Sequence, residues 1–241
     1  MQLENVVLDA IDPQRLGRFW QSALGCEQLT DAPGIFETRL DIDGLLLDLC
    51  FVEVPDPSTQ APRLHLDLAS GDDQQQTVQR LLALGATPLD VGQGDVPWVV
   101  LADPEGNPCC VMEERAAYAG TGPIAALPLS SADPDRDADF WRWLTGWTEV
   151  DGVAPRSLRH PSLRGPLLEL CPEAAPKTPS KNRLHLDVRL EAGEDADEVG
   201  ARIVERGGRA LPAQWGDFPW RSYTDPSGNE LCVLPVSSSS S

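Results

Sequence analysis

The chain has 241 residues, with 38 acidic against 19 basic side chains, a formal net charge of −19 and a pI near 4.4. A negative field of this size repels nucleic acids and anionic membranes, so we expect neither as a partner. No apolar run approaches the ~18 residues of a membrane span and the N-terminus has no basic-then-apolar signal segment, so we expect a cytoplasmic protein.

The first part of the chain predicts a strand, a helix and a set of further strands. A strand is expected over 3–11, followed by a helix that begins at Asp12-Pro13 and ends at Gly25. Aspartate caps a helix, proline suits its first position and glycine its end, so both boundaries are marked. Further strands are expected near 26–30, at 35–42 and at 45–52, with Asp43-Gly44 as the turn of the last hairpin.

The same order follows a second time after a proline-rich connector at 55–62. A strand begins at Arg63, and a helix over 72–84 is stopped by Gly85. The remaining strands are expected at 88–91, 98–102 and 109–113, with a tight turn over 103–107. The first half therefore contains two units of the form βαβββ.

From about Ile124 the whole course repeats with almost no gaps. The matching segments are Asp12-Pro13 with Asp133-Pro134, Phe19-Trp20 with Phe140-Trp141, 44–50 with 165–171, 94–98 with 216–220, and 103–111 with 225–233. Such a register indicates duplicated domains. We expect a first domain over 1–116, a second over 124–236, and a disordered serine tail over 237–241.

A short stretch with the sequence Arg-Leu-His-Leu-Asp occurs in both halves, at 63–67 and at 183–187. In a strand its leucines lie on one face and its polar residues on the other, because successive side chains alternate. We expect the polar face to line a cavity. This interpretation makes His65 and His185 the candidate catalytic residues, and the candidate ligand-binding residues are Arg63, Asp67, Arg183 and Asp187.

Asp48 and Glu169 lie among leucines at matching positions of the two halves. A carboxylate there is costly unless it is paired, so both are predicted to bind a ligand or to belong to a polar cluster. Trp98 and Trp220, at the start of matching strands, complete the candidate ligand-binding set. The six cysteines include no Cys-x-x-Cys pair and are expected to be reduced thiols.

The chain contains four successive βαβββ units. The second unit of each half has a histidine in its opening strand and an Asp-Pro-x-Gly-Asn turn before its last strand. This arrangement resembles the vicinal oxygen chelate superfamily. The similarity is to its glyoxalase-like branch, which includes bleomycin-resistance-type binding proteins and ring-cleaving dioxygenases. The resemblance implies an α+β fold in which four βαβββ units form two glyoxalase-like cupped-sheet domains. The units pair either first with second or first with fourth, and the sequence leaves both pairings open.

The resemblance also implies metal ligands on the first and last strands of each unit, usually His or Gln, Glu, His and Glu. The matching residues are Asn5, Asp48, His65 and Cys110 in the first half, and Ala126, Glu169, His185 and Cys232 in the second. Because two of four ligands are lost in each half, we favour no metal or other cofactor. If a divalent metal is bound, its candidate ligands are either Asp48, His65 and Cys110 or Glu169, His185 and Cys232. If the first unit pairs with the fourth, the ligand set would instead combine Asn5 and Asp48 with His185 and Cys232.

The favoured function is therefore binding of a small apolar or aromatic molecule in a cupped cavity without metal. The alternatives are a divalent-metal-dependent lyase, isomerase or dioxygenase, a metal-free acid–base enzyme using His65 or His185 with a neighbouring carboxylate, and a scaffold whose cups are filled by their own side chains. The only expected partner is a small molecule, and the expected assembly is a monomer of two domains or a homodimer.

Overall fold

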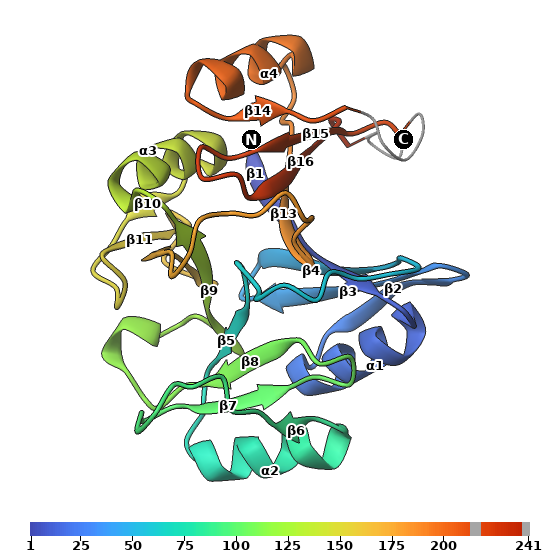
Figure 1. Ribbon diagram of the computed structural model, residues 1–241, viewed down its shortest axis with the longest axis vertical. Helices are drawn as coiled ribbons and strands as arrows, with labels where there is room; N and C mark the ends of the chain where they lie inside the picture. The colour runs from blue at the N-terminus through green and yellow to red at the C-terminus, as the bar shows by residue number, and fades with distance from the viewer. Residues whose placement is uncertain (213–217, 238–241) are drawn as a thin grey trace.

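The computed structural model describes residues 1–212 and 218–237 (Figure 1). The repeat segment 216–217 and the predicted serine tail from 238 onward lie outside the described residues. The chain forms two eight-stranded sheets, here called sheet A and sheet B.

Sheet A takes its strands from the two ends of the chain, in the order β14-β15-β16-β13-β1-β4-β3-β2. Its strands are β1 (Gln2–Ala10), β2 (Glu27–Ala32), β3 (Ile35–Ile42), β4 (Leu45–Glu53), β13 (Leu184–Arg189), β14 (Arg209–Ala210), β15 (Arg221–Thr224) and β16 (Glu230–Leu234). The halves join where β1 runs antiparallel to β13, with Val7 opposite His185. The first unit therefore pairs with the fourth.

Sheet B takes its strands from the middle of the chain, in the order β10-β11-β12-β9-β5-β8-β7-β6. Its strands are β5 (Leu66–Leu68), β6 (Thr87–Pro88), β7 (Val99–Ala102), β8 (Pro108–Val111), β9 (Ile124–Ser131), β10 (Thr148–Glu149), β11 (Arg156–Arg159) and β12 (Leu167–Pro172). Here the second unit pairs with the third, through β5 and β9 (Figure 1). Each cupped sheet thus combines one unit from each half, and the pairing that the sequence left open is resolved.

The helices begin and end largely where the sequence predicts. They are α1 (Pro13–Leu24), α2 (Gln74–Leu84), α3 (Pro134–Thr145) and α4 (Ala196–Glu205), with a short 3-10 helix η1 (Ala116–Tyr118) between the halves. Each α-helix has an aspartate N-cap whose side chain accepts a backbone N–H, as the Asp12 side chain does from Arg15. Within the described residues, none of the helices has both the length and the apolar character of a membrane span.

The repeated Phe-Trp and Asp-Pro-x-Gly-Asn motifs meet in the core. Trp20 on α1 is almost fully buried, and its indole N–H donates to Asp103 Oδ2 at 3.1 Å. Trp141 on α3 donates in the same way to Asp225 Oδ2 at 3.2 Å. Helix α1 packs on sheet A while Asp103 lies in the β7–β8 turn of sheet B, so each of these hydrogen bonds ties the two sheets together.

Replacement of Trp20 by phenylalanine tests this link. The variant loses the indole donor and leaves a buried Asp103 oxygen with one bond fewer, which costs about 1–3 kcal/mol before any loss of packing. We expect the free energy of unfolding in urea to fall by at least that amount. The matched control is Trp220→Phe, because Trp220 is 37% exposed and is expected to stay within ~0.5 kcal/mol of wild type; equal effects of the two changes would contradict the link.

Candidate functional site

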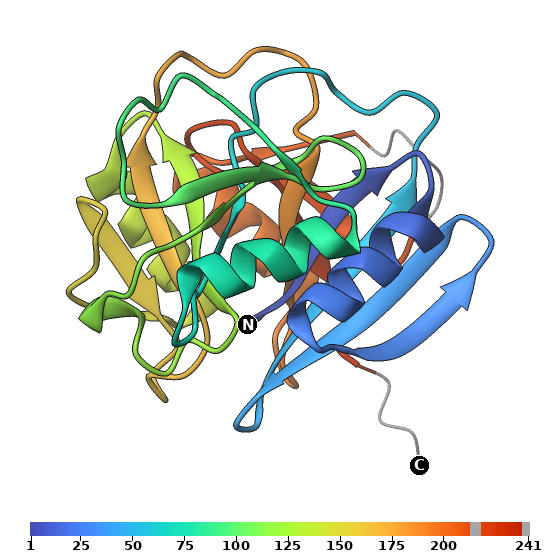
Figure 2. The same cartoon turned by 90° about the horizontal axis from the view of Figure 1, so that it is seen from below.

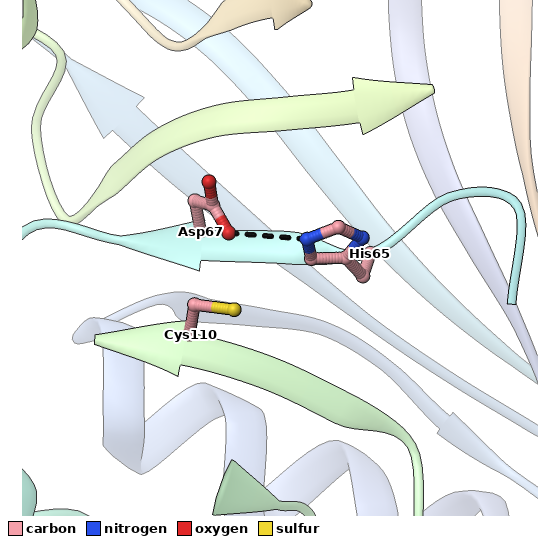
Figure 3. A group of neighbouring side chains, drawn as sticks. All are labelled: His65, Asp67 and Cys110. Atoms are coloured by element: carbon pink, nitrogen blue, oxygen red, sulfur yellow. Dashed lines mark ion pairs between the residues drawn. The ribbon is translucent and has the colours of Figure 1, made fainter. Parts of the chain in front are cut away.

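Three potential metal ligands, from β5, the residue before it and β8, meet at one place on sheet B (Figure 3). Leu64, Leu66 and Leu68 face the helix layer and are buried, so alternation along the strand turns His65 and Asp67 to the other side. Parallel pairing of β5 with β8 sets Cys110 opposite Asp67. One donor atom from each of His65, Asp67 and Cys110 lies within 4.8 Å of the others, and His65 Nε2 is 3.2 Å from Asp67 Oδ1.

Sheet A contains the same arrangement from the other repeat. Parallel pairing of β13 with β16 sets Cys232 opposite Asp187. His185 Nε2 lies 3.4 Å from Asp187 Oδ1 and 3.7 Å from Cys232 Sγ. Asn5 on β1 donates from its amide to Asp187 Oδ2 at 3.2 Å. The two repeats therefore each bring together a histidine, an aspartate and a cysteine.

The charges of the sheet A cluster are balanced within it. Burial is the largest influence on His185 and lowers its pKa, but hydrogen bonding and charge from Asp187 and Cys232 outweigh it and raise the pKa to about 10. The imidazole is therefore held as a cation beside Asp187. Asp48, in the neighbouring strand, accepts two hydrogen bonds of 2.8 Å from the Arg39 guanidinium. Both carboxylates thus have cationic partners.

The sheet B cluster contains two buried carboxylates, with the charges of Arg115 and His65 near them. Asp67 and Glu169 are only 5% and 4% exposed. Burial, and then the charge of Asp67, raises the pKa of Glu169 to about 7, which shows that the two carboxylates act on one another. Among the described residues, the only hydrogen bond given to Glu169 is from the Val153 N–H at 3.4 Å. Buried carboxylates of this kind are normally paired with a cation or a metal.

The buried thiols of this region are not nucleophiles. Burial raises the pKa of Cys110 far above its usual range, and the charge of Asp67 adds to the effect. Burial likewise raises the pKa of Cys171 to about 12. A thiol in this state becomes a thiolate only when something cationic displaces its proton, as a metal does.

The donor atoms fit a zinc-type cation. With metal–ligand distances of ~2.0–2.3 Å, donors around a tetrahedral ion lie ~3.3–3.7 Å apart, close to the separations of 3.2, 3.4 and 3.7 Å in the two clusters. Asp67 Oδ1 and Asp187 Oδ1 are buried, and each faces the Nε2 atom of the histidine two residues before it in the chain. Three ligands of mixed N, O and S type with one open position are typical of catalytic zinc sites.

The structure separates the ligand sets that the sequence suggested. Asp48 lies in sheet A and His65 in sheet B, while Glu169 lies in sheet B and His185 in sheet A. The set of Asp48, His65 and Cys110 is therefore not brought together, nor is that of Glu169, His185 and Cys232. The physical reason is the crossed pairing of units, which joins residues of opposite halves in each sheet.

The two matching carboxylates, Asp48 and Glu169, also differ in which residues lie opposite them on the neighbouring strands. Residues that lie opposite one another across several strands are here called a row. Asp48 pairs with Asn5, which in turn pairs with Asp187. Glu169 lies instead in the row of His65, with one β9 residue between them. The pairing of β12 with β9 is therefore shifted by two residues relative to the pairing of β4 with β1. Because of this shift, only sheet B has one of the two matching carboxylates in the same row as its histidine.

The two predicted arginines lie before their strands and bind turns of the other half. Arg63 donates to Asn229 Oδ1 at 2.7 Å and pairs with Glu173 at 2.8 Å. Arg183 pairs with Glu105 at 3.5 Å. These contacts hold the halves together, away from the His-Asp-Cys clusters.

The two predicted tryptophans differ in their surroundings. Trp98 is partly buried beside the cluster in sheet B, beneath the Arg115 guanidinium at 5.8 Å. Trp220 is partly exposed and stacks on Phe218 with ring centroids 4.4 Å apart. Of the pair, only Trp98 is part of the sheet B cup.

Sequence reasoning missed the linker residues that close the cup of sheet B. Tyr118 of η1 is buried against Cys110 and its apolar neighbours, and the Arg115 guanidinium lies within 3.5 Å of its hydroxyl. Burial, and then the charges of Glu169 and Asp67, raise the pKa of Tyr118, which places the phenol near both carboxylates. The only signal was an aromatic residue in a segment otherwise typical of a linker.

Comparisons with known proteins agree with this architecture. The family model described as "Glyoxalase-like domain" matches residues 5–112 and again 126–234. Glyoxalase I from Zea mays has a similar structure, with a TM-score of 0.66 at 17% identity over 97% of this chain and 92% of that one. A glyoxalase/bleomycin resistance protein/dioxygenase family enzyme from Burkholderia phytofirmans matches 46% of this chain and 97% of its own, with a TM-score of 0.37 and 18% identity.

A sequence comparison with curated proteins finds no match. At 17% identity the likeness to the maize enzyme concerns the fold alone. The family model, in contrast, covers most of both halves, in the order and number that the repeat predicts. The chain therefore belongs to the glyoxalase-like domain family, as a tandem pair of such domains.

Proposed function

We propose that the chain binds a small oxygen-bearing molecule in the cup of sheet B, at a divalent cation held by His65, Asp67 and Cys110. The observation that carries the proposal is the meeting of three potential metal ligands. The Asp67 carboxylate is buried, the His65 Nε2 lies 3.2 Å from its Oδ1, and one donor atom from each of His65, Asp67 and Cys110 lies within 4.8 Å of the others. A second buried carboxylate, Glu169, adds to the negative charge there. A cation would compensate both.

The surrounding residues suit a ligand with an apolar body and a polar end. Val100, Met112, Tyr118, Ala126 and Leu167 form one buried apolar cluster with Cys110, and Trp98 packs against it. A bound cation would act as a Lewis acid toward a ligand oxygen. Glu169, with its pKa near neutrality, would hold or release a proton at its carboxyl group next to that ligand.

The metal part of the proposal is tested by elemental content and thermal stability. Wild-type protein purified without chelators is expected to carry zinc or a similar divalent ion. Adding Zn²⁺ to stripped protein at about 100 times its Kd should add ~3 kcal/mol of stability. Asp67→Asn should lose most of this gain, because the change removes a charged ligand.

The matched control is Asp187→Asn, which alters the equivalent residue of sheet A. It should retain the gain with Zn²⁺, because the cluster there is already balanced by His185. No stabilisation of wild type by any divalent ion would contradict the metal, and a selective loss in Asp187→Asn would move the site to sheet A.

The buried charge of Glu169 predicts a pH dependence in metal-free protein. Its pKa rises from 4.5 when exposed to about 7 in the fold, so the folded state binds the proton more tightly. Stability is therefore lost as pH rises from 4.5 through 7, by about 3 kcal/mol at most. Glu169→Gln does not titrate, so with chelator present it should be no more stable than wild type near pH 4.5 and clearly more stable above pH 7. Parallel stability–pH curves for the two proteins would show that Glu169 is not strained by its charge.

A second candidate function, metal-free binding of a small apolar or aromatic molecule, is favoured by a cavity at the end of sheet A. The cavity has a volume of about 420 Å³, within the range of ligand pockets. Its walls include the Arg39–Asp48 ion pair, the half-exposed Leu46 and the indole of Trp147. It thus offers apolar surface beside a charged pair, and needs no metal.

Filling the cavity tests this candidate. Compounds from an aromatic small-molecule panel that raise the melting temperature of wild type should lose their effect in Leu46→Trp, because the larger ring occupies the cavity. Leu84→Trp on α2 is the matched control, since Leu84 is similarly exposed and lies outside the cavity. Hits that survive in Leu46→Trp would exclude this cavity.

A further inference from the structure

A separate cavity lies outside both cups, between the two proline-rich connectors. The connector after β4 and the connector after β12 run along one edge of the molecule, at the top of Figure 2 in cyan and orange. A cavity of about 170 Å³ between them is lined by residues 58, 60–63, 174–178 and 180–183, together with Ser130. This site is distinct from the His-Asp-Cys clusters, so its test is independent of the proposed function.

The wall of this cavity is cationic in a strongly acidic protein. Its lining residues include Arg63, Lys177, Lys181 and Arg183, and no aspartate or glutamate. Lys177 and Lys181 are the only two lysines in the whole sequence, which has 38 acidic residues. Basic residues are thus concentrated at one place where acidic ones are excluded.

Carboxylates lie behind the cations rather than in the wall. Lys177 pairs with Glu230 at 3.2 Å, Arg63 with Glu173 at 2.8 Å, and Lys181 with the buried Asp9, and none of these three carboxylates lines the cavity. These pairs fix the cations in place, and the cations, unlike their carboxylate partners, are among the residues that line the cavity. The charges nearest to a ligand dominate because Coulomb energy falls with distance. Arg183 is held more loosely, with its closest carboxylate oxygen at 3.5 Å and no described hydrogen-bond partner for its buried Nε.

The two lysines have no basic counterpart in the first half of the chain. Arg63 and Arg183 are equivalent in the repeat, so the first-half counterparts of Lys177 and Lys181 are Pro57 and Ala61. The first connector therefore reaches the same cavity without either cation. The hydroxyl-bearing side chains in the lining are Ser58, Ser130, Thr178 and Ser180. Hydroxyl and ammonium groups together are the donors that a small oxyanion needs.

We propose that this cavity binds a small oxyanion, the phosphate or carboxylate group of a ligand. Its small volume suits one such group, and its donors come from both halves of the chain. The two sources of oxyanion chemistry are separated by titrating inorganic phosphate and acetate by calorimetry, at constant ionic strength in chloride buffer. Saturable binding of either is expected, and the stronger one identifies the group.

The decisive variants change Ala61, because this exposed residue lines the cavity and no native ion pair is removed with it. Ala61→Lys copies Lys181 at the equivalent position and should tighten binding about fivefold, whereas Ala61→Glu should weaken it about fivefold, as expected for one charge near the ligand. Ala83→Lys and Ala83→Glu on α2 are the matched controls, and should leave the affinity within about twofold because salt screens distant charges.

Opposite shifts in the Ala61 pair, without shifts in the Ala83 pair, would support the site. The absence of saturable binding of either anion to wild type would overturn the proposal. Equal affinities of Ala61→Lys and Ala61→Glu, or shifts of the same size in the Ala83 pair, would overturn it as well. Far-ultraviolet circular dichroism of each variant verifies that the affinities are compared between folded proteins.

Discussion

A buried hydrogen bond from an indole to a carboxylate, made once in each half, is the interaction on which the architecture depends. Trp20 reaches Asp103 and Trp141 reaches Asp225, each from a helix on one sheet to a turn of the other. Because every sheet combines units of both halves, each half spans both sheets and needs such a link inside the core. Arg63 strengthens the arrangement from outside by binding the turn at Asn229.

The crossed pairing also decides which polar residues meet. It places Asp48, which is already paired with Arg39 of the same hairpin, in one row with Asn5 and Asp187 of sheet A, and it brings Glu169 of the second half near His65 and Asp67 of the first half in sheet B. Two clusters with the same three residue types thus differ in charge. Sheet A holds the pair of His185 and Asp187, while sheet B adds a second buried carboxylate, Glu169, near the pair of His65 and Asp67.

Local features of the chain could be predicted from sequence and the pairing of units could not. The Asp12 cap, the Asp43-Gly44 turn and the polar face of the Arg-Leu-His-Leu-Asp strands depend on neighbouring residues, and the structure has them as expected. The sequence does not show whether β5 pairs with β1 or with β9, because these two strands are equivalent in the repeat and have similar patterns of apolar residues. The two-residue shift of β12 is invisible for the same reason, because the leucines around Glu169 fit either register. Tyr118 was missed because linker residues carry no periodic pattern.

The central claim is that the buried acid of sheet B is organised to hold a metal. Anomalous X-ray diffraction at the zinc edge, from crystals of zinc-loaded wild-type protein, tests it most directly. We expect one strong peak between β5 and β8, in contact with His65, Asp67 and Cys110, and no equivalent peak at His185. A peak at the sheet A cluster alone, or zinc bound only at surface carboxylates, would contradict it.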